Sequence, residues 1–531
     1  MGIIKKGIVS GVCFLVPLIS YADNLYLPDF HETVAKFYAS GSSNTAFLTE
    51  YPLKRVSYLQ AFAVISNGDF VNFNQSDNAY RVGMKTESYF RLNDRIMLYG
   101  MRSYGMDRGK NMSGSAFIAP DEAPFDLVEM TDTCAGSKRL EAYKLSGGVA
   151  YQLNSKVSLG GKIFYQTSNY AKFKDLRHQN SRMDLSVDLG ATYTPWSWIT
   201  FGLSYTYNRQ NESVGFGVYG NTDRQYYTLI NYGGFIGRKE AFGESGYTSD
   251  TTPLFTQSHG GGVQLLFNLN DNMKWFNEFR YSNADGRFGT GDDRDIIYST
   301  HEVKTLNYQS KFIYQQNKDT HAVELAFNKI STTNFENNYK ESTDENGVSQ
   351  IVYYGKNEML DRSVLNGTVS YTFYRNSDQV NRSKFFMGAR FSFSSRDGKT
   401  SVFPFYRKQK INQWSAEWFG THNWFKNKQV FTLSLLAGYG AGGGTMKDDG
   451  TYIEVSDKQK RPANRNDLLE QEYDYLTASR IYGKLSAGYE RYILKNVSGY
   501  VTAGISPKYA LNSTLKEKSY LQFDIQIGVK F

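Results

Sequence analysis

Two glycine-rich stretches and the histidines are the residues whose types and spacing could support catalysis or cofactor binding. Gly438, Gly440 and Gly443 fit the G-x-G-x-x-G spacing of a dinucleotide-binding turn, but that turn opens a helix, and here a long polar stretch follows. Residues 258–262 (SHGGG) match the oxyanion loop of some esterases, yet the chain contains no G-x-S-x-G nucleophile. The six histidines show no H-x-x-H or H-E-x-x-H spacing. We therefore expect a protein that is not an enzyme and carries no cofactor or metal ion.

Charged residues at alternate positions within apolar stretches form a second candidate site. Successive side chains of a strand point to opposite faces, so these charges would share one face and the apolar residues the other. Charges lining a membrane pore tune which solutes pass, whereas the same charges could also pair with one another and merely hydrate the wall. The set mixes both signs with a modest basic excess, and we leave both interpretations open. Its members are Lys85, Glu87, Arg91, Lys144, Lys162, Asp184, Asp188, Lys274, Glu278, Arg280, Arg390, Lys484 and Glu490.

The elements that must position these charges are strands. The clearest one ends the sequence, because in residues 521–531 (LQFDIQIGVKF) every odd position is apolar and every even one is polar or Gly. The same two-residue period recurs from Tyr80 onward, for example at 183–193 and 431–439. Aromatic residues fit a pleated sheet, and they make up 16% of the chain, with 41 Tyr and 36 Phe. The sequence therefore predicts an all-β protein.

The connections between these strands are unequal at the two ends of the predicted sheet. Short turns rich in Asn and Asp alternate with long polar stretches, and this asymmetry is typical of outer-membrane barrels rather than of tandem β-sandwiches. We predict a transmembrane, antiparallel, up-and-down β-barrel of about 18 strands (roughly 16–20), with short periplasmic turns and long extracellular loops. Its last strand should pair with 497–505 and with the first strand, 55–66. The expected loops lie at about 107–141, 208–257, 283–300, 331–360, 395–412 and 440–478.

The chain divides into three predicted parts. Residues 1–22 combine Lys5 and Lys6, a short apolar run, and small residues at 20 and 22, which is typical of a secretory signal peptide. Neither this run nor any later stretch reaches the ~20 apolar residues of a membrane helix. Residues 23–54 lack alternation, so they are expected either to enter the lumen as a small plug or to hang in the periplasm. Residues 55–531 form the barrel.

Charge and cysteine content exclude two further classes. The net charge of +8 is scattered over 531 residues without a basic block, so we expect no nucleic-acid partner. Of the two cysteines, Cys13 lies in the signal peptide, which leaves only Cys134. An internal disulfide is therefore not expected to stabilise the mature protein.

The signal peptide, the repeated strands and the ending FDIQIGVKF together resemble the β-barrel outer-membrane proteins of Gram-negative bacteria. The resemblance covers nearly the whole chain and implies export to the outer membrane and contact with its lipid. It also implies recognition by the barrel-assembly machinery. In such proteins the last strand carries the assembly signal, which would map onto Phe523, Ile525, Ile527, Val529 and Phe531.

The resemblance names an architecture and not a substrate. The segment before the first strand is shorter than the plug domain of TonB-dependent transporters. We expect a porin-like role, namely passive or facilitated passage of small polar solutes through a water-filled or gated lumen. The alternative is a non-conducting barrel that binds periplasmic or surface partner proteins, or surface glycans, within a secretion or uptake complex. An open lumen favours passage, whereas a lumen packed by residues 23–53 and by inward loops favours binding or gated uptake.

Overall fold

The computed structural model describes residues 26–531, apart from residues 113, 131–134, 221–223, 244–245, 249–250, 291–295, 344–346, 348, 378–379, 495, 513 and 515–517. The predicted signal peptide, residues 1–22, lies outside the described residues. No described helix is long and apolar enough to cross a membrane.

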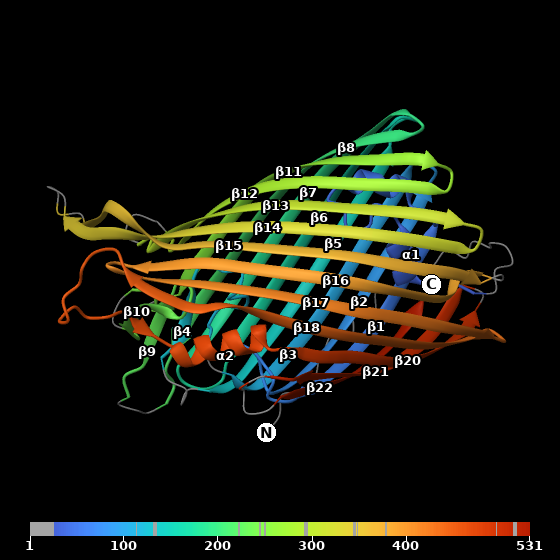
Figure 1. Ribbon diagram of the computed structural model, residues 1–531. Helices are drawn as coiled ribbons and strands as arrows, with labels where there is room; N and C mark the ends of the chain where they lie inside the picture. The colour runs from blue at the N-terminus through green and yellow to red at the C-terminus, as the bar shows by residue number, and fades with distance from the viewer. Residues whose placement is uncertain are drawn as a thin grey trace, which may run out of the picture.

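Eighteen strands form one closed antiparallel sheet, which confirms the predicted barrel (Figure 1). The first strand, β1, pairs with both β2 and the last strand, β22, in registers such as Tyr58 with Lys530. Strand β22 pairs on its other side with β21, as the sequence predicts. The strands are β1 (Arg55–Asn67), β2 (Asn78–Asn93), β3 (Ile96–Met112), β5 (Gly136–Gln152), β6 (Val157–Lys172), β7 (Arg177–Trp196), β8 (Ile199–Gly217), β11 (Thr252–Asn270), β12 (Met273–Phe288), β13 (Ser299–Gln316), β14 (Asp319–Thr343), β15 (Ser349–Ser377), β16 (Val380–Val402), β17 (Phe405–Lys426), β18 (Gln429–Thr451), β20 (Arg480–Leu494), β21 (Val497–Ala510) and β22 (Ser519–Lys530).

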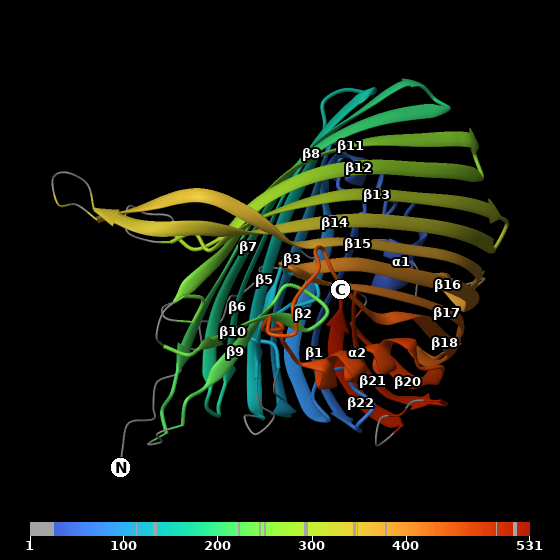
Figure 2. The same ribbon diagram turned by 60° about the vertical axis from the view of Figure 1, so that its left-hand side comes forward.

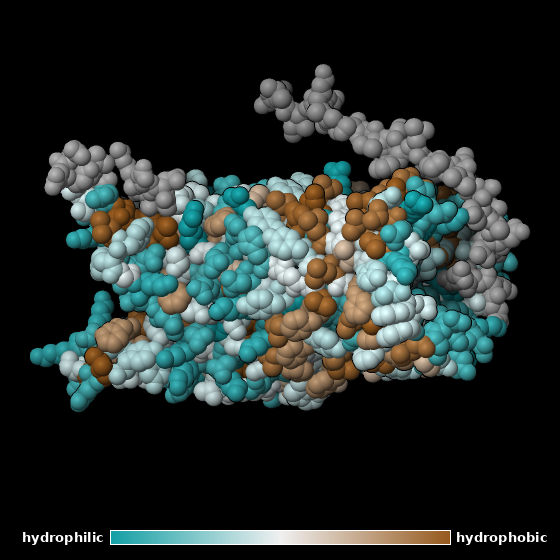
Figure 3. Space-filling view, turned by 90° about the horizontal axis from the view of Figure 1, so that it is seen from above, coloured by the Kyte–Doolittle hydropathy of each residue, from teal (hydrophilic) through white to brown (hydrophobic). Residues whose placement is uncertain are grey.

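The outer face of the wall is apolar. Large hydrophobic side chains at alternate positions, such as Leu145 (57% exposed) and Leu203 (66%), point away from the lumen. Figure 3 shows hydrophobic side chains gathered along part of the wall, while hydrophilic ones dominate its left-hand part. Because lipid offers backbone groups no hydrogen-bond partner, only a closed sheet can present this face to a membrane. The wall therefore has the surface of a transmembrane barrel.

Aromatic side chains ring the end of the barrel where the turns are short. Trp196 and Trp198 stack with ring centroids 5.9 Å apart beside the connection between β7 and β8. Trp275 and Trp424 are exposed on the same outer face. Aromatic rings of this kind settle at the membrane–water boundary, so these residues mark one edge of the apolar band.

The two ends of the wall differ, although less simply than the sequence predicts. At one end the connections are short, for example 94–95, 197–198 and 271–272, and such turns face the periplasm in barrels of this kind. At the other end, 218–251 and 452–479 are long. However, the predicted loops 331–360 and 395–412 are wrong, because strands β14 to β17 run through most of them. Beyond the membrane the outer face of a strand meets water and can be polar, so its sequence lacks the apolar–polar alternation of a wall strand.

Two groups of smaller elements lie inside the wall. Near the short turns, residues 26–54 carry a two-turn helix α1 (Phe30–Lys36) and a 3-10 helix η1 (Thr45–Glu50), and we call this segment the plug. Near the long loops lies a small second sheet with a short helix beside it (Figure 2). The sheet contains β4 (Asp126–Glu129), β9 (Tyr227–Asn231), β10 (Ile236–Ala241) and β19 (Ala463–Asn464), and the helix is α2 (Asn466–Thr477). We call residues 114–130, 224–243 and 463–478 the cap.

Candidate functional site in the barrel lumen

Each charge predicted to line the lumen lies on the inner face of the wall. The large apolar neighbours of these charges point outward, as Tyr143 and Leu145 do on either side of Lys144. Whether the charges select solutes stays a prediction. They are Lys85, Glu87 and Arg91 on β2, Lys144 on β5, Lys162 on β6, Asp184 and Asp188 on β7, Lys274, Glu278 and Arg280 on β12, Arg390 on β16, and Lys484 and Glu490 on β20.

Many of these charges form ion pairs along the wall. Asp184 instead accepts hydrogen bonds from the amides of Asn208 (2.7 Å) and Gln210 (3.2 Å). Pairing of this kind keeps the inner face polar while leaving little net charge on it. The pairs are Lys85–Glu87 at 2.8 Å, Lys162–Asp188 at 3.2 Å, Arg280–Glu278 at 3.5 Å, Arg390–Glu417 at 3.1 Å and Lys484–Asp524 at 2.8 Å.

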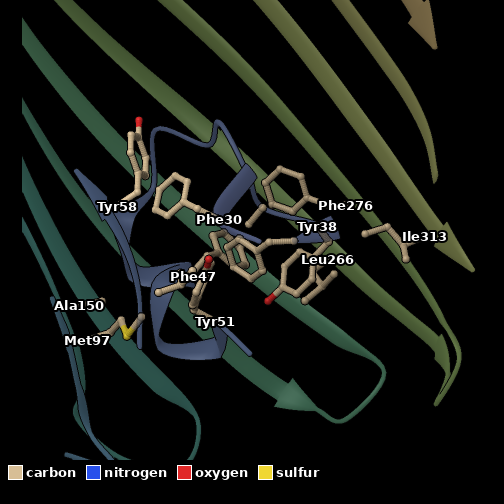
Figure 4. Packing of buried hydrophobic residues seen from close by; sticks show 13 residues of the cluster. Phe30, Tyr38, Phe47, Tyr51, Tyr58, Met97, Ala150, Leu266, Phe276 and Ile313 are labelled. Atoms are coloured by element: carbon tan, nitrogen blue, oxygen red, sulfur yellow. The ribbon is translucent and has the colours of Figure 1, made fainter. Parts of the chain in front are cut away.

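The plug closes the short-turn end through a hydrophobic cluster (Figure 4). From the plug come Phe30, Phe37, Tyr38, Phe47 and Tyr51, all at most 5% exposed. They meet inward residues of the wall near its short turns, which are Val56, Tyr58, Met97, Ala150, Leu266, Phe276 and Ile313. Burying large aromatic side chains contributes about 1.5–3 kcal/mol each. The cluster is therefore a specific packing interface and not a loose tail in the lumen.

An ionic cluster fastens one side of the plug. Lys530 Nζ lies 2.7 Å from Asp29 Oδ2 and 2.9 Å from Glu490 Oε2, and Arg382 Nη1 lies 2.8 Å from the same glutamate oxygen. Burial by itself would raise the pKa of Asp29, but the positive charges of Lys530 and Arg382 outweigh it and hold that pKa well below its usual range. Asp29 therefore stays ionised and anchored at neutral pH.

Sequence reasoning missed two members of this ionic cluster. Asp29 lies in a segment without periodicity, and Arg382 precedes the alternation that begins at Phe385. Three further contacts reinforce the same side of the plug. Glu32 accepts hydrogen bonds from the backbone N–H (2.8 Å) and hydroxyl (2.7 Å) of Ser383, and Lys36 Nζ donates to Asn376 Oδ1 at 2.6 Å.

The opposite side of the plug sits against glycines of the wall. A Cβ atom on Gly160 would lie 2.3 Å from the backbone nitrogen of Ala46, and one on Gly190 would lie 2.1 Å from Asn44 Oδ1. The Asn44 amide occupies this notch and donates to the carbonyls of Ala191 (2.9 Å) and Leu203 (3.2 Å). Only a residue without a side chain permits this approach, so the wall is shaped to receive the plug.

Charges that the sequence predicts on the inner face of the wall also hold the plug. Arg91 donates to the carbonyls of Thr49 (2.9 Å) and Tyr51 (2.8 Å). Glu278, 1% exposed, accepts a hydrogen bond from the backbone N–H of Ser43 at 3.2 Å, and the Ser43 hydroxyl lies 2.9 Å from that of Ser204. The predicted lumen charges thus serve two purposes, wall pairing and plug docking.

The cap fills the long-loop end through a second hydrophobic cluster. Phe125, Tyr232 and Tyr247 pack on Phe288 of β12 and Leu360 of β15, and all are at most 2% exposed. The phenol oxygens of Tyr232 and Tyr247 are 2.7 Å apart. Loops from three places in the chain therefore converge inside the wall.

Buried charges tie the cap to the wall. Lys172 of β6 pairs with Glu129 of β4, and their side chains are 0% and 9% exposed. Arg407 of β17 donates to the carbonyl of Gly234 at 2.8 Å. On α2, Glu472 binds Arg396 of β16 through two hydrogen bonds of 3.0 and 2.8 Å. Removing one partner of such a desolvated pair is strongly destabilising, because the other charge stays buried without compensation.

A cavity of about 380 Å³ remains between the plug and strands β2 to β7, and a smaller one of about 140 Å³ lies beside the ionic cluster. Among the described residues, no group of three or more His, Cys, Asp and Glu side chains is arranged to hold a metal ion. Gly438, Gly440 and Gly443 lie within strand β18. They are therefore not followed by the helix that a dinucleotide-binding turn requires.

The residues of the predicted assembly signal lie on the outer face of β22 and just after it. Phe523, Ile525 and Ile527 are 51%, 45% and 59% exposed, and Val529 continues the same face. Phe531 follows the strand, and the guanidinium carbon of Arg55 lies 5.0 Å from its ring centroid. Recognition of these residues by the assembly machinery stays a prediction.

Similar solved structures are outer-membrane receptors and transporters. The ferric preacinetobactin receptor BauA of Acinetobacter baumannii is 10% identical, with 90% of this chain and 80% of that chain covered and a TM-score of 0.41. The outer-membrane transporter YddB of Escherichia coli is 8% identical (89% and 80% covered, TM-score 0.40). The toluene transporter TodX of Pseudomonas putida is 11% identical (93% and 94% covered, TM-score 0.29). No curated protein matches the sequence.

The closed barrel and its apolar outer face confirm the predicted outer-membrane architecture. Residues 45–531 match a family described only as a family of unknown function, DUF6850. The matched region contains η1 and the whole wall, from β1 to β22. The chain is therefore an outer-membrane β-barrel protein that belongs to the DUF6850 family.

Proposed function

We propose that this protein is a gated transporter through which small polar solutes cross the outer membrane when the plug leaves the lumen. The observation that carries the proposal is the seating of one continuous segment, residues 26–54, in a shaped and mostly polar site of the inner wall. Its contacts are hydrogen bonds, ion pairs and packed side chains, all of which can be broken and remade. The paired charges of the inner wall would keep the vacated lumen hydrated.

Conductance in planar bilayers tests this proposal directly. Full-length protein should open rarely, whereas a variant lacking residues 26–53 should open more often, because only deformation of the cap at the long-loop end then limits passage. Slower gel migration after heating would verify that the variant barrel is folded. A folded deletion variant that conducts no more than the full-length protein would overturn the proposal.

A disulfide between plug and wall provides the converse test in the full-length chain. Since the hydroxyls of Ser43 and Ser204 are 2.9 Å apart, the variant S43C/S204C, built with Cys134 replaced by Ser, should form a disulfide under oxidising conditions. Oxidation should abolish the rare openings and a reductant should restore them. The single variant S43C is the matched control and should not respond to either treatment. Openings that persist in the oxidised double variant would show that the plug is not the gate.

A second candidate function, binding of a partner protein, is favoured by one observation. Strand β14 pairs with β13 only up to Glu336, and β15 pairs with β16 only from Leu360 onward. Beyond these points β14 and β15 pair with each other and project as a ribbon (Figure 1), on which Tyr354 is 68% exposed. Deleting residues 338–358 should leave conductance unchanged if passage is the function of the barrel. Loss of conductance would instead show that the hairpin contributes to passage itself, and would count against a separate binding role.

A further inference from the structure

The cavity of about 380 Å³ is bounded by both moving and fixed parts of the proposed gate. The plug supplies one side, through residues between Val34 and Leu48. Strands β2, β3, β5, β6 and β7 supply the other side. Its volume lies in the range of pockets that enclose small ligands, roughly 300–1,000 Å³. A solute held here would touch the plug and the wall at once.

Aromatic rings form part of the wall side of this cavity. Tyr89 and Tyr99 line it with ring centroids 4.9 Å apart, and Phe164 of β6 lines it as well. Tyr89 also stacks on Tyr51 of the plug, with centroids 4.6 Å apart and an interplanar angle of 14°. The Tyr99 hydroxyl donates to Glu87 at 2.9 Å, which fixes that ring. The rings are therefore preorganised surfaces against which a flat or ring-shaped solute can pack.

The polar groups of the cavity balance one another in charge. Lys162 and Asp188 both line it and pair at 3.2 Å, and Asp188 also accepts a hydrogen bond from Thr206 at 2.7 Å. Ser146 and Ser186 add hydroxyl groups. A charged solute would compete with an existing ion pair, whereas a neutral solute with several hydroxyls can accept from Lys162, donate to Asp188 and do either with the serines.

We propose that this cavity binds a neutral polyhydroxylated ring compound, of the size of a mono- or disaccharide, between the plug and the aromatic wall. The proposal rests on the proposed function and deepens it by naming the solute class. Stacking of a sugar ring on Phe164 and hydrogen bonds to the serines and the Lys162–Asp188 pair would supply affinity. Because the plug forms one side of the cavity, a bound solute would contact the gate as well as the wall.

Calorimetric titration of the full-length protein tests the solute class, in a detergent without a sugar headgroup. The titrants are maltose, the anionic ring sugar glucuronate and the cationic ring sugar glucosamine. Maltose should bind and the charged sugars should bind at least tenfold more weakly. Phe164→Ala should weaken maltose binding by about tenfold, which corresponds to about 1.4 kcal/mol, since the sugar ring loses its stacking surface. Phe419→Ala is the matched control, because Phe419 lies on β17 with its ring facing Arg390 of β16 and does not line this cavity, and it should leave the affinity unchanged.

Each contrary result is informative. Absence of maltose binding, or equal affinity in the wild type and a folded Phe164→Ala variant, would overturn the site. Stronger binding of glucuronate or glucosamine than of maltose would overturn the assigned solute class. Proteoliposomes that contain the variant lacking residues 26–53 separate this proposal from the proposed function, since that variant needs no binding site to let maltose through. If maltose passes through the deletion variant but does not bind the full-length protein, only the binding site is refuted. If maltose binds the full-length protein but does not pass through the deletion variant, only the transport function is refuted.

Discussion

The plug and the cap close opposite ends of the same lumen, but they are connected to the wall in different ways. The plug is one segment joined to the wall covalently only where β1 begins at Arg55. The cap consists of three loops, each joined to wall strands at both of its ends. Its charges, such as Lys172 and Glu129, are almost entirely buried. Under the proposed function, the plug would leave the lumen as a unit, whereas the cap could only deform.

The largest effect should come from breaking the buried ion pair of the cap. Lys172→Met leaves Glu129 buried without its partner, so we expect the cap to lose about 3–5 kcal/mol of local stability. Hydrogen exchange of peptides from residues 114–130 should accelerate strongly, while exchange of the plug stays unchanged. The double variant Lys172→Met/Glu129→Met should recover much of the loss. An equal acceleration of hydrogen exchange in the plug would mean that the stabilities of the cap and the plug are coupled.

A smaller effect is expected from adding one methyl group beneath the plug. The Cβ atom in Gly160→Ala would lie 2.3 Å from the Ala46 nitrogen, and overpacking of this kind costs about 1–3 kcal/mol. Bilayer openings should become more frequent and exchange in η1 should rise, with the cap unaffected. Gly148→Ala on the neighbouring strand is the control, since its Cβ would be 3.4 Å from the nearest atom. If both variants behave alike, the notch does not hold the plug.

A third predicted effect concerns pH and differs between the cap and the plug. Burial raises the pKa of Asp126 in the cap to about 7, although a hydrogen bond from Ser115 and the charge of Lys138 oppose it. The folded cap then holds a proton that the unfolded chain has lost, so the stability of the cap should fall as pH rises from about 4 to about 7 and stay level above that. Exchange protection of residues 116–129, corrected for intrinsic rates, should be lower at pH 8 than at pH 5. Asp126→Asn should remove the difference.

The plug should show no such dependence on pH. Because the pKa of Asp29 is lowered, its anchoring contribution is complete above the unfolded value near 4 and is lost only as pH falls through the folded value. The frequency of bilayer openings should therefore be constant from pH 5 to 8. A marked rise in openings at pH 5 would indicate that a group other than Asp29 controls docking.

The wall was largely predictable because the membrane imposes its own pattern. Outward residues such as Leu145 must be apolar and their neighbours face the lumen, so strand positions and barrel closure could be read from alternation. The alternation stops where the strands leave the lipid. For this reason the sequence predicts loops at residues 331–360 and 395–412. The outer face of those strands meets water, while inner positions such as Thr400 and Arg407 are buried against the cap, so polar residues occupy both faces and leave no apolar–polar alternation.

The occupied lumen could not be predicted in the same way. The plug contacts join residues far apart in sequence, such as Asp29 and Lys530, and no local pattern pairs them. Gly160 and Gly190 look like ordinary strand glycines until the plug is placed over them. The charges themselves were located on the inner face, but alternation cannot distinguish Lys162, which pairs within the wall, from Arg91, which holds the plug.

The anchor of the plug at Lys530 also sets an order of events during biogenesis. Lys530 is the last residue of β22, the strand that completes the wall by pairing with β1. Asp29 is made first and its partner almost last, some five hundred residues later. The docking site for the plug thus does not exist until the final strand has been incorporated. Seating of the plug is coupled to completion of the chain, and a prematurely terminated barrel lacks its anchor.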